Sequence, residues 1–316
     1  MNQVLSLKNL SLLEILLPHK TMKRRAWPGV LALSYVALIY VLGGLRIDHI
    51  LMSSLVILDY YNPHTRKFLF YFFPFILLGL VFDSMRYYYW QGVEGNIHVA
   101  GPYYRDLKYF GIPTEVGGVV KKLTPNEFFD LYQWKWVDVI TGFAYITFII
   151  EYLVTAVLLY VCQMYLTLKR FGWSFLTVNV MGFATYFIYP AAPPWYVTKY
   201  GFEPRMYVSP SSASAVRFDQ IMGTNFFGEM YSKGIDVYGA YPSLHVAYPF
   251  LVMWVMCTVK EFKIFRIPTI FFWLLMNFSA VYLQHHYVVD ILLGNLYAMI
   301  TVWLIKKVPF KTETQG

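Results

Sequence analysis

Long apolar runs constrain this 316-residue chain more than any other feature of its sequence. A helix needs about 20 apolar residues to cross a bilayer, where every backbone polar group must be hydrogen-bonded within the protein. Apolar residues make up 58% of the chain and charged residues only 14%, whereas soluble domains contain about 25% charged residues. We therefore predict an integral membrane protein. Suitable runs lie at 67–85, 138–166, 172–189, 243–260, 266–282 and 286–306.

The N-terminal third is less regular. The run at 28–45 is long enough to span, whereas the run at 50–61 is too short to do so comfortably. Residues 1–17 alternate polar and apolar positions without a charged start or a cleavage site, which predicts an amphipathic surface helix rather than a signal peptide.

These patterns predict an all-α fold, a polytopic transmembrane helix bundle. Its parts are an N-terminal segment at 1–66, which forms a hydrophobic hairpin or in-plane helices, a six-span catalytic core at 67–306 and a cytoplasmic tail at 307–316.

Clusters of basic residues indicate the orientation. If the core holds six spans, all the clusters within it fall on one side, and the positive-inside rule makes that side cytoplasmic. The cluster at 20–25 joins them only if 28–61 crosses the membrane an even number of times or not at all, whereas a single crossing would place it outside. The long loops at 87–137 and 190–242 then face outward and should cap the bundle. The basic loops also explain the net charge of +8, so nucleic acid is not expected as a partner.

One histidine stands at a predicted helix start. In Tyr-Pro-Ser-Leu-His at 241–245, Pro242 predicts a turn, Ser243 a helix N-cap and His245 a place in the first turn. Free N–H groups at such an end form an anion site, which would put the imidazole and Ser243 beside a phosphate. The alternative is an interfacial histidine next to a simple helix cap.

A second histidine opens the final run. His286 and Asp290 are four residues apart and would lie one turn apart on one helical face, where the carboxylate could orient the imidazole. An ionisable group inside an apolar helix is costly, which favours a functional role over a plain polar helix end. His285 would point about 100° away on an ideal helix and is the weaker candidate.

Two histidines at one membrane face suit phosphotransfer. One attacks phosphorus to form a phosphohistidine, and the other protonates the leaving alkoxide and later deprotonates the acceptor. The negative charge on the phosphoryl oxygens needs cations or N–H donors. Arg217 is the preferred phosphate ligand, and Arg86 is a second candidate that could equally form a structural pair with Asp83. No histidine or carboxylate cluster requires a metal or another cofactor.

These motifs resemble those of the type 2 phosphatidic acid phosphatase superfamily, in which Pro-Ser-Gly-His and Ser-Arg-x5-His-x3-Asp are usual. Here Leu244 replaces the glycine and Ala280 the arginine. The departures resemble the inositol phosphorylceramide synthases of fungi, the target of aureobasidin, as do Gly-Ala-Tyr-Pro-Ser-Leu-His at 239–245, Tyr-Leu-Gln-His-His-Tyr-Val-Val-Asp at 282–290 and Pro-Ala-Ala-Pro-Pro-Trp-Tyr at 190–196. The resemblance covers 172–306 well and the N-terminal third only in outline.

The resemblance implies a His286 nucleophile, an Asp290 orienter, a His245 acid/base and a substrate contact at Tyr196. It also implies a phospholipid donor, phosphatidylinositol, and a ceramide-like acceptor, with the site on the lumenal side. The short chain favours a bacterial relative in the inner membrane, with the site on the periplasmic side, over a Golgi enzyme. A lipid-phosphate phosphatase that uses water as the acceptor remains the alternative, and a transporter or scaffold would not need the three residues to converge.

Overall fold

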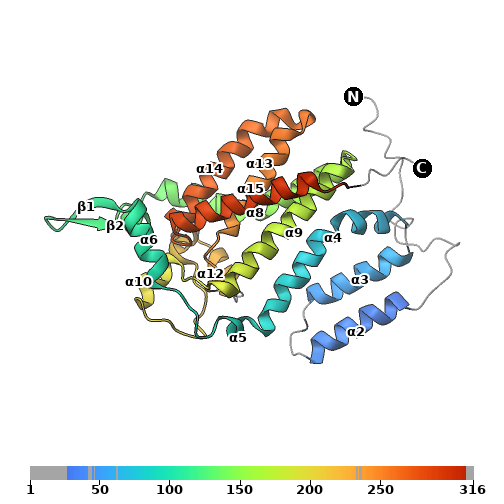
Figure 1. Cartoon of the computed structure of the whole chain (residues 1–316), viewed down its shortest axis with the longest axis horizontal. Helices are drawn as coiled ribbons and strands as arrows, with labels where there is room; N and C mark the ends of the chain where they lie inside the picture. Colours follow the sequence, from blue (N-terminus) through green and yellow to red (C-terminus); the bar gives the residue numbers. More distant parts are fainter. Residues whose placement is uncertain are drawn as a thin grey trace.

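The computed structural model describes residues 27–41, 45, 47–61, 63–232, 234 and 237–310. Its helices run side by side, with α2, α3 and α4 on one flank and a small β-hairpin projecting from the opposite end (Figure 1). The amphipathic helix predicted at 1–17 and the basic cluster at 20–25 lie outside the described residues.

Six helices form the core, in the places of the six predicted runs. In the part of the chain that the structure describes, five helical stretches are long and apolar enough to cross a membrane. Four lie in α4, α8, α9 and α15, and the fifth, Lys260–Tyr282, consists of α14 and the short helix before it. Helix α13, with 15 residues and an internal proline, is shorter. The prediction of an all-α polytopic bundle is confirmed. The core helices are α4 (Pro63–Ser84), α8 (Lys135–Val161), α9 (Tyr165–Ile188), α13 (Leu244–Thr258), α14 (Arg266–Tyr282) and α15 (Val288–Lys307).

The predicted boundary between the second and third runs is wrong. Hydropathy predicts one run up to residue 166 and the next from residue 172, but the chain turns at 162–164, where Gln163 has a φ of 56°. Lys169 therefore lies inside α9, with its ammonium 5.1 Å from the centre of the Tyr71 ring. Hydropathy misplaces this turn because both of its sides are apolar and because an aromatic face accommodates the lysine.

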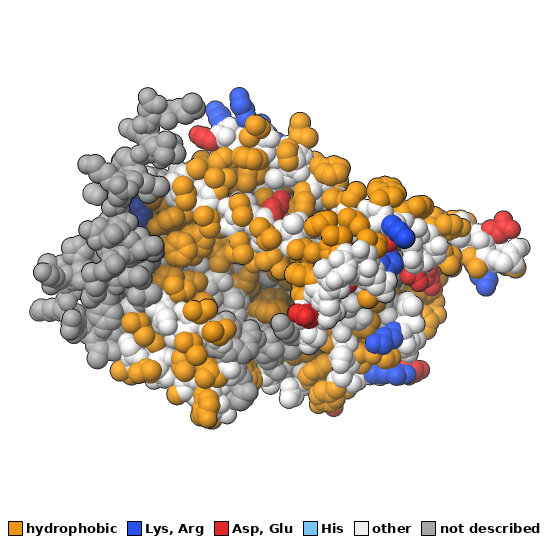
Figure 2. Space-filling view, turned by 180° about the vertical axis from the view of Figure 1, so that it is seen from behind, with side chains coloured by type: hydrophobic (Ala, Val, Ile, Leu, Met, Phe, Trp, Pro, Cys, Tyr) orange, Lys and Arg blue, Asp and Glu red, His pale blue; other side chains and the backbone are white. Residues whose placement is uncertain are grey.

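The flanks of the bundle are covered by apolar side chains (Figure 2). On α8 the exposed fraction is 53% for Ile150 and 57% for Val154, and on α14 it is 64% for Phe271. Charged side chains gather toward the edges of the same view. Apolar patches of this extent are unfavourable in water and are expected where lipid chains cover the protein.

The N-terminal helices turn back on one another. Helices α2 (Trp27–Val41) and α3 (Ile47–Tyr61) lie side by side, and α3 packs against α4 (Figure 1). The His49 Nε2 atom lies 2.7 Å from Asp83 Oδ2, so a polar contact ties the hairpin to the core. The two helices thus form a helical hairpin, and whether it crosses the membrane or lies in its plane stays a prediction.

The two segments predicted as long loops contain much regular structure. In the first are η1 (Met85–Tyr87), α5 (Tyr89–Val93), α6 (Ala100–Phe110), β1 (Ile112–Val116), β2 (Val119–Leu123) and α7 (Pro125–Leu131). The second contains α10 (Pro194–Tyr200), η2 (Ala213–Ala215), α11 (Val216–Met222) and α12 (Phe226–Ser232), and η3 (Lys260–Phe265) joins α13 to α14.

Local sequence explains the first of these segments. Gly117 and Gly118 both have positive φ and form the turn between β1 and β2, which pair antiparallel from Ile112↔Leu123 onward. Thr124 then caps α7, because its side chain accepts from the Glu127 N–H while the Glu127 carboxylate accepts from the Thr124 N–H. The glycine pair and the Thr124–Glu127 capping box are visible in the sequence, but they are weaker indicators than the long apolar runs on either side.

Backbone hydrogen bonds join the two segments at 87–137 and 190–242, which are called the outer segments below. His98 N–H donates to the Pro190 carbonyl at 2.8 Å, and the His98 carbonyl accepts from Ala192 N–H at 2.9 Å. Ala191 N–H donates in turn to the Tyr238 carbonyl at 2.8 Å. Three segments that are far apart in the sequence thus form one ladder directly before residue 240, and they fix the backbone that leads into α13.

Helices α13 and α15 cross closely where α13 begins. A Cβ atom on Gly294 would lie only 2.1 Å from the Ser243 carbonyl oxygen. In the same place, Ser243 N–H donates to the Asp290 carbonyl at 3.0 Å. Gly294 is therefore required by the close approach of two backbones.

Replacing Gly294 with alanine should destabilise the protein by about 1–3 kcal/mol, because the added methyl group forces the start of α13 away from α15. Thermal unfolding of the purified protein in detergent measures the effect. Gly79→Ala, in the transmembrane helix α4, is the matched control, since no atom lies within 4 Å of its added Cβ. An unchanged Tm for Gly294→Ala would contradict the tight crossing.

Candidate active site

The first part of the site is the start of α13. Ser243 occupies the predicted N-cap position and His245 lies in the first turn. The Ser243 side chain makes no cap hydrogen bond, however, and its Oγ is buried without a partner in the described part of the chain. Its backbone instead bonds to Asp290, which brings the predicted motifs at 241–245 and 282–290 into contact.

The second part is the start of α15, where the geometry differs from the predicted one. His286 precedes the helix instead of sharing a helical face with Asp290. Asp290 Oδ2 accepts from the Tyr287 N–H at 2.8 Å and lies 3.7 Å from His286 Nδ1. The carboxylate is therefore first a cap of α15 and second a charge beside the imidazole.

A backbone carbonyl orients His286 more directly. His286 Nδ1 lies 2.8 Å from the Ala240 oxygen, at the end of the backbone ladder. A carbonyl oxygen only accepts, so Nδ1 carries the proton and Nε2 of the neutral ring holds a lone pair. Sequence spacing gives no signal for this contact, because it depends on how the outer segments fold.

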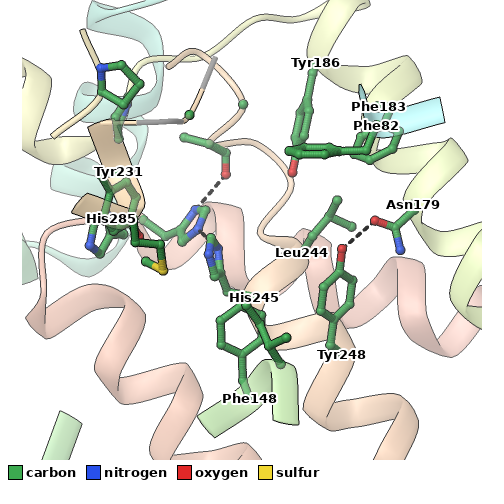
Figure 3. A pocket seen from close by; sticks show the side chains of 18 of the residues that line it. Phe82, Phe148, Asn179, Phe183, Tyr186, Tyr231, Leu244, His245, Tyr248 and His285 are labelled. Atoms are coloured by element: carbon green, nitrogen blue, oxygen red, sulfur yellow. Dashed lines mark hydrogen bonds between the residues drawn. The ribbon is translucent and has the colours of Figure 1, made fainter. Parts of the chain in front are cut away.

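The two predicted catalytic histidines face one another. His245 Nδ1 lies 2.9 Å from His286 Nε2, and Figure 3 shows His245 in the centre of the site. With the lone pair on His286 Nε2, the hydrogen bond runs from the His245 N–H to His286. The structure thus joins a nucleophilic nitrogen directly to a proton donor.

Two further side chains brace this loop. Buried Asn126, in α7, donates to the carbonyls of Val281 and His286 at 2.9 and 3.0 Å. His285 lies between the rings of Tyr145 and Tyr231, with centroids 4.9 and 4.7 Å away. Burial, reinforced by nearby His286, lowers the pKa of His285 to about 3, so this ring stays neutral at physiological pH.

An apolar cavity of about 500 Å³ begins at the histidines and extends between the transmembrane helices. His245, His285 and His286 line its polar end. Side chains of α4, α8 and α9 line much of the remainder, among them Leu78, Phe82, Phe148, Leu153, Phe175 and Phe183. A reactive end joined to a long apolar chamber fits a substrate with a polar head and hydrocarbon chains.

The predicted phosphate ligand Arg217 has partners elsewhere. Its Nε donates to Asp138 Oδ1 at 2.7 Å, and its guanidinium lies 5.1 Å from the centre of the Tyr282 ring. Arg217 is not among the residues that line the cavity. Asp138, in the first turn of α8, was not singled out from the sequence because an acidic residue at a helix start is common.

The other predicted contacts lie as follows. Arg86 is in η1, and its side chain lies outside the described residues. Its expected partner Asp83 contacts His49. Tyr196 is fully buried, donates to the Glu203 carbonyl at 2.7 Å and is absent from the cavity lining, to which the preceding residue, Trp195, belongs.

Sequence reasoning missed two charged residues in α6. Arg105 donates to the Tyr189 hydroxyl and lies 5.6 Å from the centre of the ring of Tyr241, which opens the first motif. Asp106 is fully buried and its Oδ1 accepts from the Val289 N–H at 3.2 Å. Burial, reinforced by nearby Asp290, raises the Asp106 pKa to about 7. In the sequence both residues look like ordinary loop charges.

A family comparison matches residues 123–304, which hold all three predicted catalytic residues, to the PAP2 superfamily. The chain belongs to this superfamily. The match confirms the resemblance of the histidine motifs to those of the type 2 phosphatidic acid phosphatase superfamily.

Within the PAP2 superfamily, the chain is similar to several proteins that are named as synthases of inositol-containing sphingolipids. The chain is 35% identical to the phosphoinositol dihydroceramide synthase of Bacteroides thetaiotaomicron over 267 residues, which are 83% of this chain and 84% of the relative. It is 31% identical to the inositol phosphorylceramide synthase of Candida albicans over 44% of this chain and 29% of the relative. The catalytic subunit of the Saccharomyces cerevisiae enzyme is 30% identical over 38% of this chain and 29% of its own length. No solved structure gives a significant match.

Arg217→Gln should strongly destabilise the protein, by about 3–5 kcal/mol, because it leaves the buried Asp138 carboxylate without its partner. The double variant Asp138→Asn/Arg217→Gln should recover most of the stability and the activity, because it removes both charges. Thermal unfolding and turnover of the four proteins measure this. A stable but inactive double variant would instead assign Arg217 to the phosphate.

Proposed function

We propose that this protein transfers the phosphoinositol group of phosphatidylinositol to the primary hydroxyl of a ceramide-type lipid. His286 carries the group as a phosphohistidine. The observation that carries the proposal is the His245–His286 pair at the polar end of an apolar cavity, with the His286 Nε2 lone pair oriented by the Ala240 carbonyl. The relatives named as synthases of inositol phosphorylceramide, or of its dihydroceramide counterpart, support these substrates.

The first step forms a phosphorus–nitrogen bond. The phosphodiester enters between the two imidazoles and replaces their mutual hydrogen bond. His286 Nε2 attacks phosphorus, and the bond from phosphorus to the diacylglycerol oxygen breaks. Beside the bound phosphodiester anion His245 carries a proton on both ring nitrogens, and it donates one of them to that oxygen, so neutral diacylglycerol leaves. The Ala240 carbonyl and the Asp290 carboxylate stabilise the positive ring of the phosphohistidine.

The second step reverses these roles. His245, now neutral, removes the proton from the primary hydroxyl of the acceptor, and the alkoxide attacks phosphorus. The phosphorus–nitrogen bond breaks and its electron pair returns to His286 Nε2. The products are the inositol phospholipid of the acceptor and the enzyme in its starting protonation state, with no net consumption of protons.

Charge on the non-bridging oxygens needs N–H or O–H donors. The first-turn N–H groups of α13 lie at the end of the helix where His245 stands, and helix N-termini favour anions. The Ser243 hydroxyl is buried without a partner in the described part of the chain and is close in sequence to the same N–H groups. We assign Ser243 and this helix end to the phosphate.

The character of the cavity supports a lipid alcohol over water as the acceptor. Its lining between α4, α8 and α9 is dominated by aromatic and aliphatic side chains. Hydrocarbon chains that fill this space exclude water from the phosphohistidine, which favours transfer over hydrolysis.

We further propose that the site faces away from the cytoplasm. The chain order puts Arg66, Lys169, Lys263 and Lys306 at the end of the bundle opposite the histidines, since α4 and α9 run toward the site and α13 and α15 run away from it. By the positive-inside rule, that far end is cytoplasmic. The match to a bacterial relative of similar length supports the periplasmic face of an inner membrane.

His286→Asn should abolish transfer by more than 1,000-fold, because the amide has no nucleophilic nitrogen, while its N–H group can still bond to the Ala240 carbonyl. The measurement incubates phosphatidylinositol labelled in its inositol ring with a fluorescent ceramide and separates the lipids by chromatography. Without acceptor, wild-type protein should keep an acid-labile label that the variant lacks. Inositol phosphate released in place of a new lipid would indicate a hydrolase.

Impermeant thiol reagents should distinguish the two faces in intact cells. Native Cys162 is exposed in the α8–α9 turn at the far end, so it should react only after permeabilisation. With Cys162 and Cys257 replaced by alanine, Ser212→Cys, in the outer segment before η2, should react without permeabilisation. The opposite pattern would invert the orientation.

A further inference from the structure

Besides the histidines, the cavity wall contains a hydrogen-bonded pair of polar side chains, Asn179 and Tyr248. The Tyr248 hydroxyl, on α13, donates to Asn179 Oδ1 on α9, and Asn179 Nδ2 donates to the Phe175 carbonyl at 2.8 Å. Both residues line the cavity, and Figure 3 shows their polar groups facing each other on the far side of Leu244 from His245. An interhelical hydrogen bond alone would explain the pair, but not its place in the cavity wall.

The pair lies one helical turn from the reactive histidine. Tyr248 follows His245 by three residues in α13, so the two side chains share a face and their Cα atoms differ by about 4.5 Å along the axis. Side chains lean toward the N-terminus of a helix, which brings the Tyr248 hydroxyl back toward the reactive end. A group only a few bonds from the reacting hydroxyl of a bound lipid falls within reach of the pair.

The hydrogen bond to Asn179 gives the tyrosine a defined polarity. A phenol has one proton and two acceptor positions, and this proton is committed to the Asn179 carbonyl oxygen. The Tyr248 oxygen is therefore oriented as an acceptor. Because Asn179 is itself held by Phe175, rotation of the amide does not reverse this polarity. In an apolar cavity such an acceptor favours a ligand that offers N–H or O–H.

We propose that the Asn179–Tyr248 pair selects the acceptor lipid by accepting a hydrogen bond from an amide N–H on the carbon next to the reacting CH₂OH group. In N-acylated amino-alcohol lipids this nitrogen is three bonds from the reacting oxygen. Diacylglycerol carries an ester oxygen at the equivalent position and offers no hydrogen there. Tyr248 contacts the lipid and Asn179 is a positioning residue. The inference rests on the proposed function.

This selection has a chemical purpose in the proposed reaction. Diacylglycerol is the product of the first step, so it is present at the site whenever the phosphohistidine exists. If it were accepted as readily as the amide lipid, the second step would simply regenerate phosphatidylinositol. A site built to bond an N–H rejects an analogue without it far better than a site that relies on shape.

The test compares acceptors on wild-type protein first. With phosphatidylinositol as donor, kcat/KM is measured for a ceramide, its N-methyl derivative and a diacylglycerol with matched acyl chains, the last by transfer of labelled inositol phosphate. We expect ceramide to exceed each of the other two by at least 10-fold. Equal rates for ceramide and its N-methyl derivative would overturn the proposal without need of any variant.

Variants then locate the effect. Tyr248→Phe removes only the hydroxyl, and Asn179→Leu removes its orienting partner. Both should reduce the preference for ceramide by 10-fold or more, mostly through the ceramide kcat/KM, with the diacylglycerol rate nearly unchanged. Tyr160→Phe is the matched control, since this tyrosine of α8 packs on Phe68 and Phe72 away from the cavity and should leave the preference intact.

The outcomes separate the two proposals. If wild-type protein forms no new lipid from any acceptor, the proposed function fails. If wild-type protein prefers ceramide and the Tyr248→Phe variant keeps the same preference, only the role of the pair fails. A variant that lowers the rates with both acceptors equally and also lowers Tm would make the pair a structural link between α9 and α13, which likewise overturns the inference.

Discussion

The hydrogen bond from His286 Nδ1 to the Ala240 carbonyl is the interaction on which the site depends. It fixes the tautomer of the imidazole and thereby puts the lone pair on the nitrogen that faces His245. The carbonyl is held in turn by the backbone ladder through His98 and Ala191, which joins the two outer segments. The chemistry of one side chain therefore depends on the folding of three segments spread over more than half of the chain.

The start of α15 completes this arrangement. Asp290 caps α15 and Asp106 accepts from the next turn of the same helix, so two carboxylates share one positive helix end. Arg105 lies beside them, and its guanidinium packs against Tyr189 and Tyr241. Burial raises the pKa of Asp106 to about 7, which lets the helix end accommodate both carboxyl groups without two full negative charges. His286 thus lies next to a helix end whose partial positive charge is offset by the Asp290 and Asp106 carboxyl groups.

Within the cavity, the lining changes abruptly from the polar end that holds the histidines to the apolar part between the helices. Neutral His285, sandwiched by two tyrosines, contributes no charge at this boundary. Beyond it the lining is mostly apolar, with tyrosine hydroxyls, Ser211 and Asn179 as its polar groups. A lipid bound there keeps its head in the polar part and its chains between transmembrane helices, which is where a head-group transfer must take place.

The sequence by itself determined the helix bundle and the meeting of His245, His286 and Asp290, because hydropathy and short motifs act locally. Only the tertiary structure decided what each residue contacts. In the folded protein a backbone carbonyl orients His286, Arg217 donates to Asp138, and Asp83 contacts His49. Each contact joins segments that no local sequence pattern connects. Asn126, Arg105 and Asp106 escaped notice for the same reason: in the sequence they are ordinary loop residues, and they meet the site only when the outer segments fold over the helix ends.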